Sequence, residues 1–178
     1  MTAMSEKFIY EIYPAAKKDL EISPVFTTAQ AGLESGWGKS RCGSFGLFGE
    51  KTGKGWTGKR VLCPTTEIAK SQAELEWFKK NLPEITSITP TGRGYFLIHC
   101  KDWFKDFASV EDCLKQHFKL LHSANFKHAL VNGRDPIAYV KDLQDNAAGH
   151  NYATATNYVA VMCSIFPQVE AVAKRYKL

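Results

Sequence analysis

Ala29-Gln30-Ala31-Gly32-Leu33-Glu34-Ser35-Gly36-Trp37-Gly38 places one carboxylate between an apolar helix and a glycine-rich corner. Upstream, Ser23 can cap a helix and Pro24 suits its first turn. Gly36 is expected to end this helix, so Glu34 falls in the last turn, where the helix dipole favours the protonated carboxyl. Such a group can act as a general acid, whereas the alternative is an ordinary surface glutamate. The apolar stripe expected to be buried is Val25, Phe26, Ala29 and Leu33.

The pattern around Glu34 continues along the chain. Glu34-Ser35-Gly36-Trp37-Gly38-Lys39-Ser40 is followed by Phe45-Gly46-Leu47-Phe48-Gly49, and Ala147-Ala148-Gly149-His150-Asn151-Tyr152-Ala153-Thr154 precedes Asn157-Tyr158. These segments resemble the peptidoglycan N-acetylglucosaminidases of glycoside hydrolase family 73, a mannosyl-glycoprotein endo-beta-N-acetylglucosaminidase-like domain. The resemblance implies a lysozyme-like α+β fold. It also implies an enzyme that cleaves the β-1,4 bond between N-acetylglucosamine and N-acetylmuramic acid in bacterial cell wall glycan strands.

A second carboxylate is expected, because glycoside hydrolysis commonly uses one carboxyl as acid and another as nucleophile or base. The resemblance places it at Glu67, in the segment Thr65-Thr66-Glu67. Without the resemblance, Glu67 would be interpreted as an outward-facing strand residue. If the N-acetyl group of the sugar is itself the nucleophile, Glu67 would orient that group or activate water. Glu50 is the substitute carboxylate in the same lobe.

Four aromatic residues are candidates for contacts with sugar rings. Tyr152 matches the tyrosine of the family's Ala-Gly-Tyr-Ala-Thr run, and pinning the loop before the last helix is its equal alternative. Trp37 and Phe48 flank glycine turns, where aromatic rings often wedge two elements together, so packing in the core is the favoured interpretation for both. Tyr158 is a further candidate. All four are retained as substrate-binding candidates.

The order of sequence signals predicts helices at both ends and a short β region between them. Helices are expected over about 6–20, over the Glu34 segment, from Gln72 to Leu82, after Ser109, after Asp135-Pro136 and from about 154 or 156 to 176. Strands are expected over 60–68 and 94–101. In the last helix the residues expected to face inward are Tyr158, Met162, Ile165, Val169 and Val172. This layout predicts a helical lobe, a small β lobe and a cleft between them.

Length and composition predict a single catalytic domain. A chain of 178 residues with 44% hydrophobic content can bury one sizeable core, so we expect one domain over 1–178, with a β lobe and insertion over about 47–101. A monomer is expected. No apolar run is long enough to span a membrane, and the polar N-terminus does not look like a signal peptide. Synthesis in the cytoplasm, with release by lysis or by a secretion system to act on the wall, is therefore expected.

The cysteine and histidine spacing predicts neither a disulfide framework nor a metal site. An odd number of cysteines without a Cys-x-x-Cys pair favours free thiols in a reducing compartment. His117 and His122 are interpreted as one wet and one half-buried helical residue, because no metal-binding signature surrounds them. No metal or cofactor is expected. The five cysteines are Cys42, Cys63, Cys100, Cys113 and Cys163.

Two other classes of function compete with a hydrolase. A wall-binding or structural module without turnover would fit two departures from the family pattern, namely Gly46, where relatives usually have Asn, and the long insertion from Glu67 to Phe104. A nucleic-acid-binding domain would fit the net charge of +5, but the Lys and Arg residues form no dense run, so nucleic acid is not expected as a partner. For a hydrolase, a phage endolysin and an antibacterial effector are the two settings considered.

Overall fold

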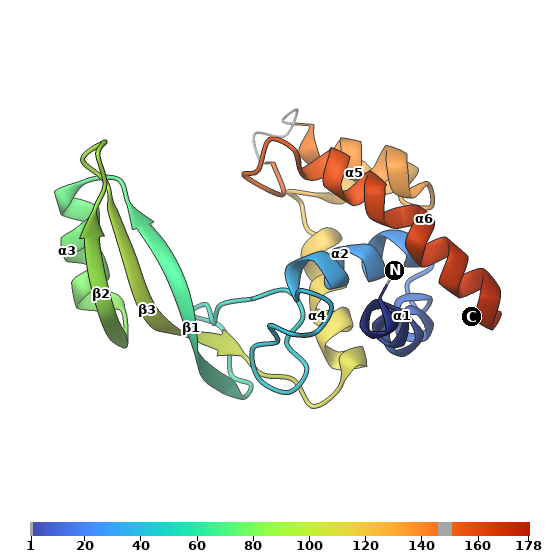
Figure 1. Ribbon diagram of the computed structural model, residues 1–178, viewed down its shortest axis with the longest axis horizontal. Helices are drawn as coiled ribbons and strands as arrows, with labels where there is room; N and C mark the ends of the chain where they lie inside the picture. The colour runs from blue at the N-terminus through green and yellow to red at the C-terminus, as the bar shows by residue number, and fades with distance from the viewer. Residues whose placement is uncertain (1, 146–150) are drawn as a thin grey trace. The chain divides into compact units, whose positions relative to one another are not determined.

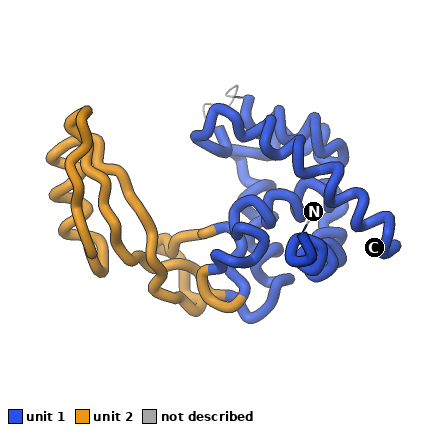
Figure 2. Tube along the Cα trace, viewed as in Figure 1, with its two compact units in different colours: residues 1–41, 45–48, 107–178 blue, residues 42–44, 49–106 orange. Residues whose placement is uncertain are grey.

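The computed structural model describes residues 2–145 and 151–178, and Figure 1 shows its helices and strands. The chain divides into two compact units, coloured separately in Figure 2. The helical unit contains residues 1–41, 45–48 and 107–178, and the β unit contains residues 42–44 and 49–106. A single catalytic domain and a cleft between the lobes stay predictions.

In the helical unit, α2 (Pro24–Glu34) is the central helix. Its residues 24–32 are all buried, and it packs against α1, α5 and α6. The predicted single stripe therefore understates its burial, and Leu33 of that stripe is only half-buried. The remaining elements are α1 (Ala3–Ala16), α4 (Val110–Leu121), the 3-10 helix η1 (Lys127–Asn132), α5 (Pro136–Gln144) and α6 (Tyr158–Tyr176).

Capping residues explain where several helices begin. Ser109 accepts a hydrogen bond from the backbone N–H of Asp112, and Asp135 caps α5 through two backbone N–H groups, as predicted. Ser23 lies at the N-cap of α2 and Pro24 in its first turn, as predicted, but the Ser23 side chain makes no capping hydrogen bond. Ser23 is buried, and its backbone N–H donates to the carbonyl of Gly133 over 2.7 Å. That contact ties the start of α2 to the segment before α5.

The core of the helical unit is built from the inward faces of α1, α2, α5 and α6. Phe26 and Tyr139 meet edge to face, with ring centroids 4.7 Å apart. In α6, four of the five predicted inward residues are buried, whereas Ile165 is half-buried and Phe166 takes the inward position. Other fully buried members of this core are Ile9, Ile22, Leu121, Val140, Leu143, Met162 and Val169.

The β unit is a three-stranded antiparallel sheet with one helix. The strands are β1 (Arg60–Ala69), β2 (Glu84–Pro90) and β3 (Phe96–Lys105), in the order β1-β3-β2, and α3 (Gln72–Asn81) follows β1. The strand predictions near 60–68 and 94–101 and the helix prediction are confirmed. β2 was not expected, because its Ser, Thr and Pro residues suggest a turn and only Ile85 and Ile88 mark its buried side.

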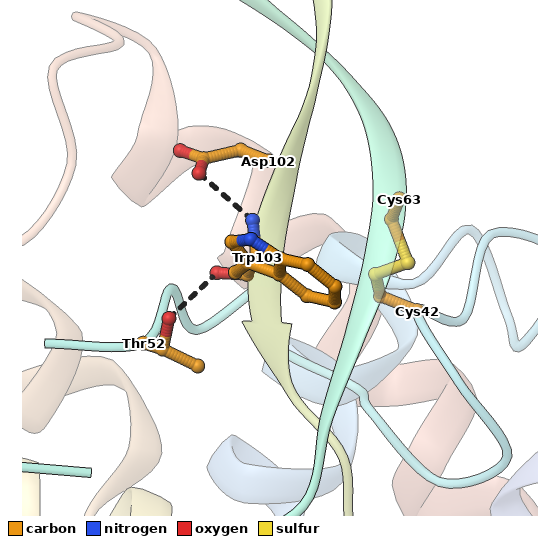
Figure 3. The surroundings of a disulfide bond; sticks show 5 residues. All are labelled: Cys42, Thr52, Cys63, Asp102 and Trp103. Atoms are coloured by element: carbon orange, nitrogen blue, oxygen red, sulfur yellow. Dashed lines mark hydrogen bonds between the residues drawn. A yellow bond between two sulfur atoms is a disulfide. The ribbon is translucent and has the colours of Figure 1, made fainter. Parts of the chain in front are cut away.

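A disulfide joins Cys42 to Cys63 on β1, so the expectation that all cysteines are free is wrong for this pair (Figure 3). The two residues are 21 positions apart in the chain, yet their Cα atoms lie 6.1 Å apart. Cys100 and Cys163 keep free thiols, and Cys113 is buried. The disulfide closes a loop that includes residues 50–52. These residues lie along the end of β3 through contacts such as the hydrogen bond from the Thr52 hydroxyl to the Trp103 carbonyl (Figure 3).

Candidate functional site

The corner after Glu34 is a run of three residues in the left-handed region. Gly36, Trp37 and Gly38 have φ values of +56°, +58° and +83°. Glycine adopts such values without steric cost, whereas a bulky residue such as Trp37 is strained there. Backbone strain of this kind persists only where surrounding contacts over-determine the conformation.

Those contacts are present on both sides of the corner. The Trp37 backbone N–H donates to the Gly32 carbonyl over 2.7 Å. The buried Ser35 hydroxyl donates to the Ala31 carbonyl over 2.6 Å and accepts from the Gly38 N–H over 2.9 Å. A side chain at Gly32 would lie 2.8 Å from the Trp37 ring, so only glycine admits that ring. The Glu-Ser-Gly-Trp-Gly motif therefore fixes the end of α2, and with it the Glu34 backbone.

Glu34 lines a hollow of about 630 Å³ in the helical unit. Glu34 is an exposed residue at the rim whose carboxyl is partly enclosed by protein, and it has no hydrogen bond or ion pair within the described residues. Burial of the carboxyl by the surrounding protein raises the pKa of Glu34 above its ordinary value. The predicted direction is therefore confirmed, and the cause that the structure gives is desolvation of the carboxyl. The lining residues are Leu33, Glu34, Leu120, Phe126, Tyr152, Ala153, Thr154, Ala155 and Tyr158.

Two of the four aromatic candidates lie in this hollow and two do not. Tyr152 and Tyr158 line it, with ring centroids 5.8 Å apart. Trp37 packs edge to face on Phe8 of α1, with centroids 5.8 Å apart, and Phe48 stacks on His117 with centroids 3.6 Å apart and planes 8° from parallel. The segment 147–150, which begins the Ala-Gly-Tyr-Ala-Thr run, lies outside the described residues.

Leu120 and Phe126 also line the hollow, although neither is predicted from the sequence to be a site residue. A signal for Leu120 is present, because it is apolar yet lies outside the buried stripe of α4, and it is 38% exposed. An exposed apolar residue beside an aromatic cluster is typical of a ligand-binding hollow.

A buried polar chain stands behind the hollow. His117 on α4 contacts the side-chain oxygen of Gln30 through Nε2 over 2.8 Å, and the Gln30 amide nitrogen donates to the Tyr158 hydroxyl over 2.9 Å. His117 is fully buried, so its interpretation as a wet or half-buried residue is wrong. The pKa of Tyr158 is raised, first by burial and further by the charge of Glu34, although the hydrogen bond from Gln30 opposes the rise.

In the β unit, Glu67 is one of two carboxylates that share one ammonium. Lys51 Nζ contacts Glu67 Oε1 and lies 3.0 Å from Asp102 Oδ2. Burial alone would lower the pKa of Lys51, but hydrogen bonds and charge from both carboxylates outweigh it and raise that pKa. Glu67 is thus ion-paired and only 21% exposed, unlike a freely solvated strand residue. An ion pair of this kind suits an anionic role for Glu67, as nucleophile or base.

Glu50, the substitute carboxylate, pairs with a different lysine. Its Oε2 lies 2.8 Å from Lys105 Nζ, and the two side chains are 13% and 15% exposed. Within the described part of the chain, no group of His, Cys, Asp and Glu side chains is arranged to hold a metal ion. Among these residues there is also no helix with the length and apolar character needed to cross a bilayer.

Comparison with known proteins identifies the chain at the level of family and fold. The family model described as mannosyl-glycoprotein endo-beta-N-acetylglucosaminidase matches residues 10–171. The peptidoglycan hydrolase FlgJ of Pseudomonas aeruginosa is 28% identical over 180 residues. The match covers 96% of this chain but 38% of that protein, so the chain spans about two fifths of the length of this curated relative.

Solved structures show the same fold at low sequence identity. The glycoside hydrolase domain of Salmonella typhimurium FlgJ has a TM-score of 0.69 at 20% identity, with 97% of this chain and 92% of that chain covered. The catalytic domain of the autolysin Auto from Listeria monocytogenes has a TM-score of 0.68 at 23% identity, with 97% and 88% covered. These likenesses confirm the predicted lysozyme-like α+β class.

Proposed function

The chain belongs to the family of mannosyl-glycoprotein endo-beta-N-acetylglucosaminidases and is a glycoside hydrolase, and we propose that its substrate is bacterial peptidoglycan. The bond cleaved is the β-1,4 linkage between N-acetylglucosamine and N-acetylmuramic acid. The FlgJ relative is a peptidoglycan hydrolase and the Listeria protein with the same fold is an autolysin, and both support a wall substrate. The proposal rests mainly on the position of Glu34, which the glycine-rich corner holds at the edge of a hollow and whose pKa is raised by desolvation.

Glu34 is the general acid in this proposal. A carboxyl with a raised pKa is protonated over more of the neutral range, so it can donate a proton to the glycosidic oxygen as the bond breaks. Tyr152 and Tyr158 provide aromatic surface and hydroxyl groups in the same hollow, where they contact the reacting N-acetylglucosamine. Trp37 and Phe48 support the site through packing and not through sugar contact.

Glu67 is the second carboxylate. Its contact with Lys51 supports an anionic role, either as nucleophile, as base toward water, or in orienting the N-acetyl group of the substrate. The anomeric configuration of the product separates the water-attack route from the other two, because water attack on the face opposite the leaving group inverts it and the other two routes retain it.

Analysis of fragments from purified peptidoglycan tests this function. After digestion, mass spectrometry of the reduced products is expected to show N-acetylglucosamine at the new reducing end. N-acetylmuramic acid at that end would contradict the proposed bond. Tight sedimentation with the wall and no released fragments would favour the alternative, a wall-binding module without turnover.

The protein acts outside the cytoplasm in this proposal, as a monomer on glycan strands. The Cys42–Cys63 disulfide supports an oxidising compartment, because such bonds persist outside the reducing cytoplasm. A phage endolysin and an antibacterial effector are two routes by which such an enzyme reaches the wall. Alkylation of cells before lysis tests the compartment, because an oxidised protein would leave Cys42 and Cys63 unlabelled.

A further inference from the structure

Three helices contribute one buried polar chain that ends at the candidate active site. Gln30 on α2 and His117 on α4 are fully buried, and Tyr158 on α6 is 4% exposed. The contacts run from His117 Nε2 to Gln30 Oε1, at 2.8 Å, and from Gln30 Nε2 to the Tyr158 hydroxyl, at 2.9 Å. Tyr158 also lines the hollow that contains Glu34. A polar chain buried this deeply needs its donors and acceptors matched at every link.

Matching donors to acceptors sets the direction in which hydrogens are donated along this polar chain. Because Gln30 Oε1 can only accept, His117 Nε2 must carry the hydrogen in that contact. Gln30 Nε2 can only donate, so it occupies a lone pair of the Tyr158 oxygen and leaves the phenolic hydrogen unused. That hydrogen is available to point into the hollow. In the opposite arrangement, with the amide reversed, Tyr158 would donate inward and only its oxygen lone pairs would face the hollow.

The imidazole at the far end of the chain is held in place by aromatic rings. Phe48 stacks face to face on His117, with planes 8° from parallel, and Tyr152 meets the same ring edge on, with centroids 6.3 Å apart. These contacts fix the plane of the imidazole and therefore the direction of its Nε2–H bond. Phe48, which makes no contact with the hollow, acquires a role through this stack.

We propose that Gln30 and His117 are positioning residues that hold the Tyr158 hydroxyl as a hydrogen-bond donor to an oxygen of the sugar bound beside Glu34. The inference rests on the proposed function, because it assigns a task within that site. Neither Gln30 nor His117 lines the hollow, and the hydrogen bond from Gln30 to Tyr158 connects them to it. The chain thereby selects a sugar that offers an acceptor at this position.

The matched control is Tyr139 on α5. Tyr139 is fully buried and Tyr158 is 4% exposed, but the Tyr139 hydroxyl has no hydrogen-bond partner among the described residues and Tyr139 does not line the hollow. Tyr158→Phe is expected to lower kcat/KM on solubilised glycan strands about five- to tenfold, the effect of one lost hydrogen bond. Tyr139→Phe is expected to leave kcat/KM unchanged.

A double-mutant cycle tests whether Gln30 acts through Tyr158. Gln30→Met keeps the length and removes both polar contacts, and it is expected to lower kcat/KM by a similar factor, with the same division between kcat and KM as Tyr158→Phe. The double variant is expected to be no slower than Tyr158→Phe alone. The proposal would be overturned if the losses of kcat/KM in the two single variants multiplied in the double variant, with all variants folded by circular dichroism. A merely structural role of Gln30 would produce that result, because its effect would be independent of the Tyr158 hydroxyl.

The tautomer of His117 provides a test that needs no activity. Long-range ¹H–¹⁵N spectra of the wild-type protein are expected to show a protonated Nε2 on His117. An unprotonated Nε2 would reverse the chain and overturn the proposal. If the wild-type protein released no fragments from peptidoglycan, the proposed function would fail, while the spectrum would still decide the direction of the chain.

Discussion

The two candidate carboxylates have opposite surroundings. Glu34, in the helical unit, has no charged partner among the described residues and lies where burial raises its pKa. Glu67, in the β unit, contacts the ammonium of Lys51, which also holds Asp102. Burial without a cation favours a neutral acid, whereas contact with a cation favours an anion. The difference teaches that environment, and not residue type, separates the roles proposed for these two glutamates.

The means of support also differ between the units. Glu34 follows a helix whose residues 24–32 are all buried, and a corner rich in glycine holds its backbone. Glu67 lies on a strand of a small sheet with a small core, and the loop that carries Lys51 is closed by the Cys42–Cys63 disulfide. Close packing supports the first carboxylate, and a covalent link with ion pairs supports the second. Substitutions in each unit can test this contrast.

Removing the carboxyl of Glu34 is expected to have the largest effect. Glu34→Gln keeps the shape but has no proton to donate, so the rate of fragment release should fall on the order of a hundredfold or more. In the wild-type protein, activity should decline as the pH rises through the raised pKa, because the acid form is lost. Dye release from labelled peptidoglycan measures both. Retention of most activity by Glu34→Gln would remove Glu34 from the mechanism.

The stability of Glu34→Gln provides the folding control. A raised pKa means that the folded protein binds this proton more tightly than the unfolded chain does. Ionisation of Glu34 therefore lowers the free energy of unfolding as the pH rises past the ordinary pKa of glutamate. Glu34→Gln removes that cost. Its Tm should therefore equal or exceed that of the wild type at neutral pH, and the gain should vanish below about pH 4, near the ordinary pKa of glutamate.

Comparison of Glu67→Gln with Glu50→Gln tests which carboxylate of the β unit acts. Each variant removes one carboxylate from a lysine ion pair, and Lys51 keeps Asp102 as a second partner when Glu67 is replaced. Glu67→Gln is expected to lower turnover about tenfold to a hundredfold if Glu67 is nucleophile or base, and less if it only assists the N-acetyl group. Glu50→Gln should retain turnover. The reverse result would move the second carboxylate to Glu50.

Opening the disulfide is expected to destabilise the β unit. For a closed loop of this length, with Cys42 and Cys63 separated by 21 positions, the loss is about 3 kcal/mol, or about 6–12 °C in Tm. Thermal melts of Cys42→Ser with and without reductant measure it. Cys163→Ser is the control, because this half-buried residue has a free thiol. A wild-type Tm that does not change with reductant would contradict stabilisation of the β unit by the disulfide.

Adding one methyl group at Gly32 tests the packing of the glycine-rich corner. A Cβ there would lie 2.8 Å from the Trp37 ring, so Gly32→Ala is expected to cost about 1–3 kcal/mol despite the better helix propensity of alanine. Gly53→Ala, at a position with no atom within 4 Å, should cost little. Urea unfolding measures both. Equal stability of the two variants would show that the Trp37 ring moves away from the added methyl group at no cost in free energy.

Local features of the fold were predictable because the interactions that create them span only a few residues. The caps at Ser109 and Asp135 bond to backbone groups two or three positions away, and the glycines after Glu34 mark the end of its helix. Glu34 could therefore be placed at a helix end from the sequence. β2 escaped prediction because an edge strand with only two half-buried isoleucines has almost no periodic signal.

The amino-acid sequence alone determined that the N-terminal and C-terminal parts of the chain are helical, where the main strands lie, and which carboxylate lies at the glycine-rich corner. Neighbours along the chain specify these features. Only the tertiary structure decided the partners of the site residues. The Lys51–Glu67 contact spans 16 positions, the disulfide 21, the Gln30–His117 contact 87 and the Gln30–Tyr158 contact 128. Contacts at such separations depend on how whole helices and strands pack, and that packing also sets the burial that raises the pKa of Glu34.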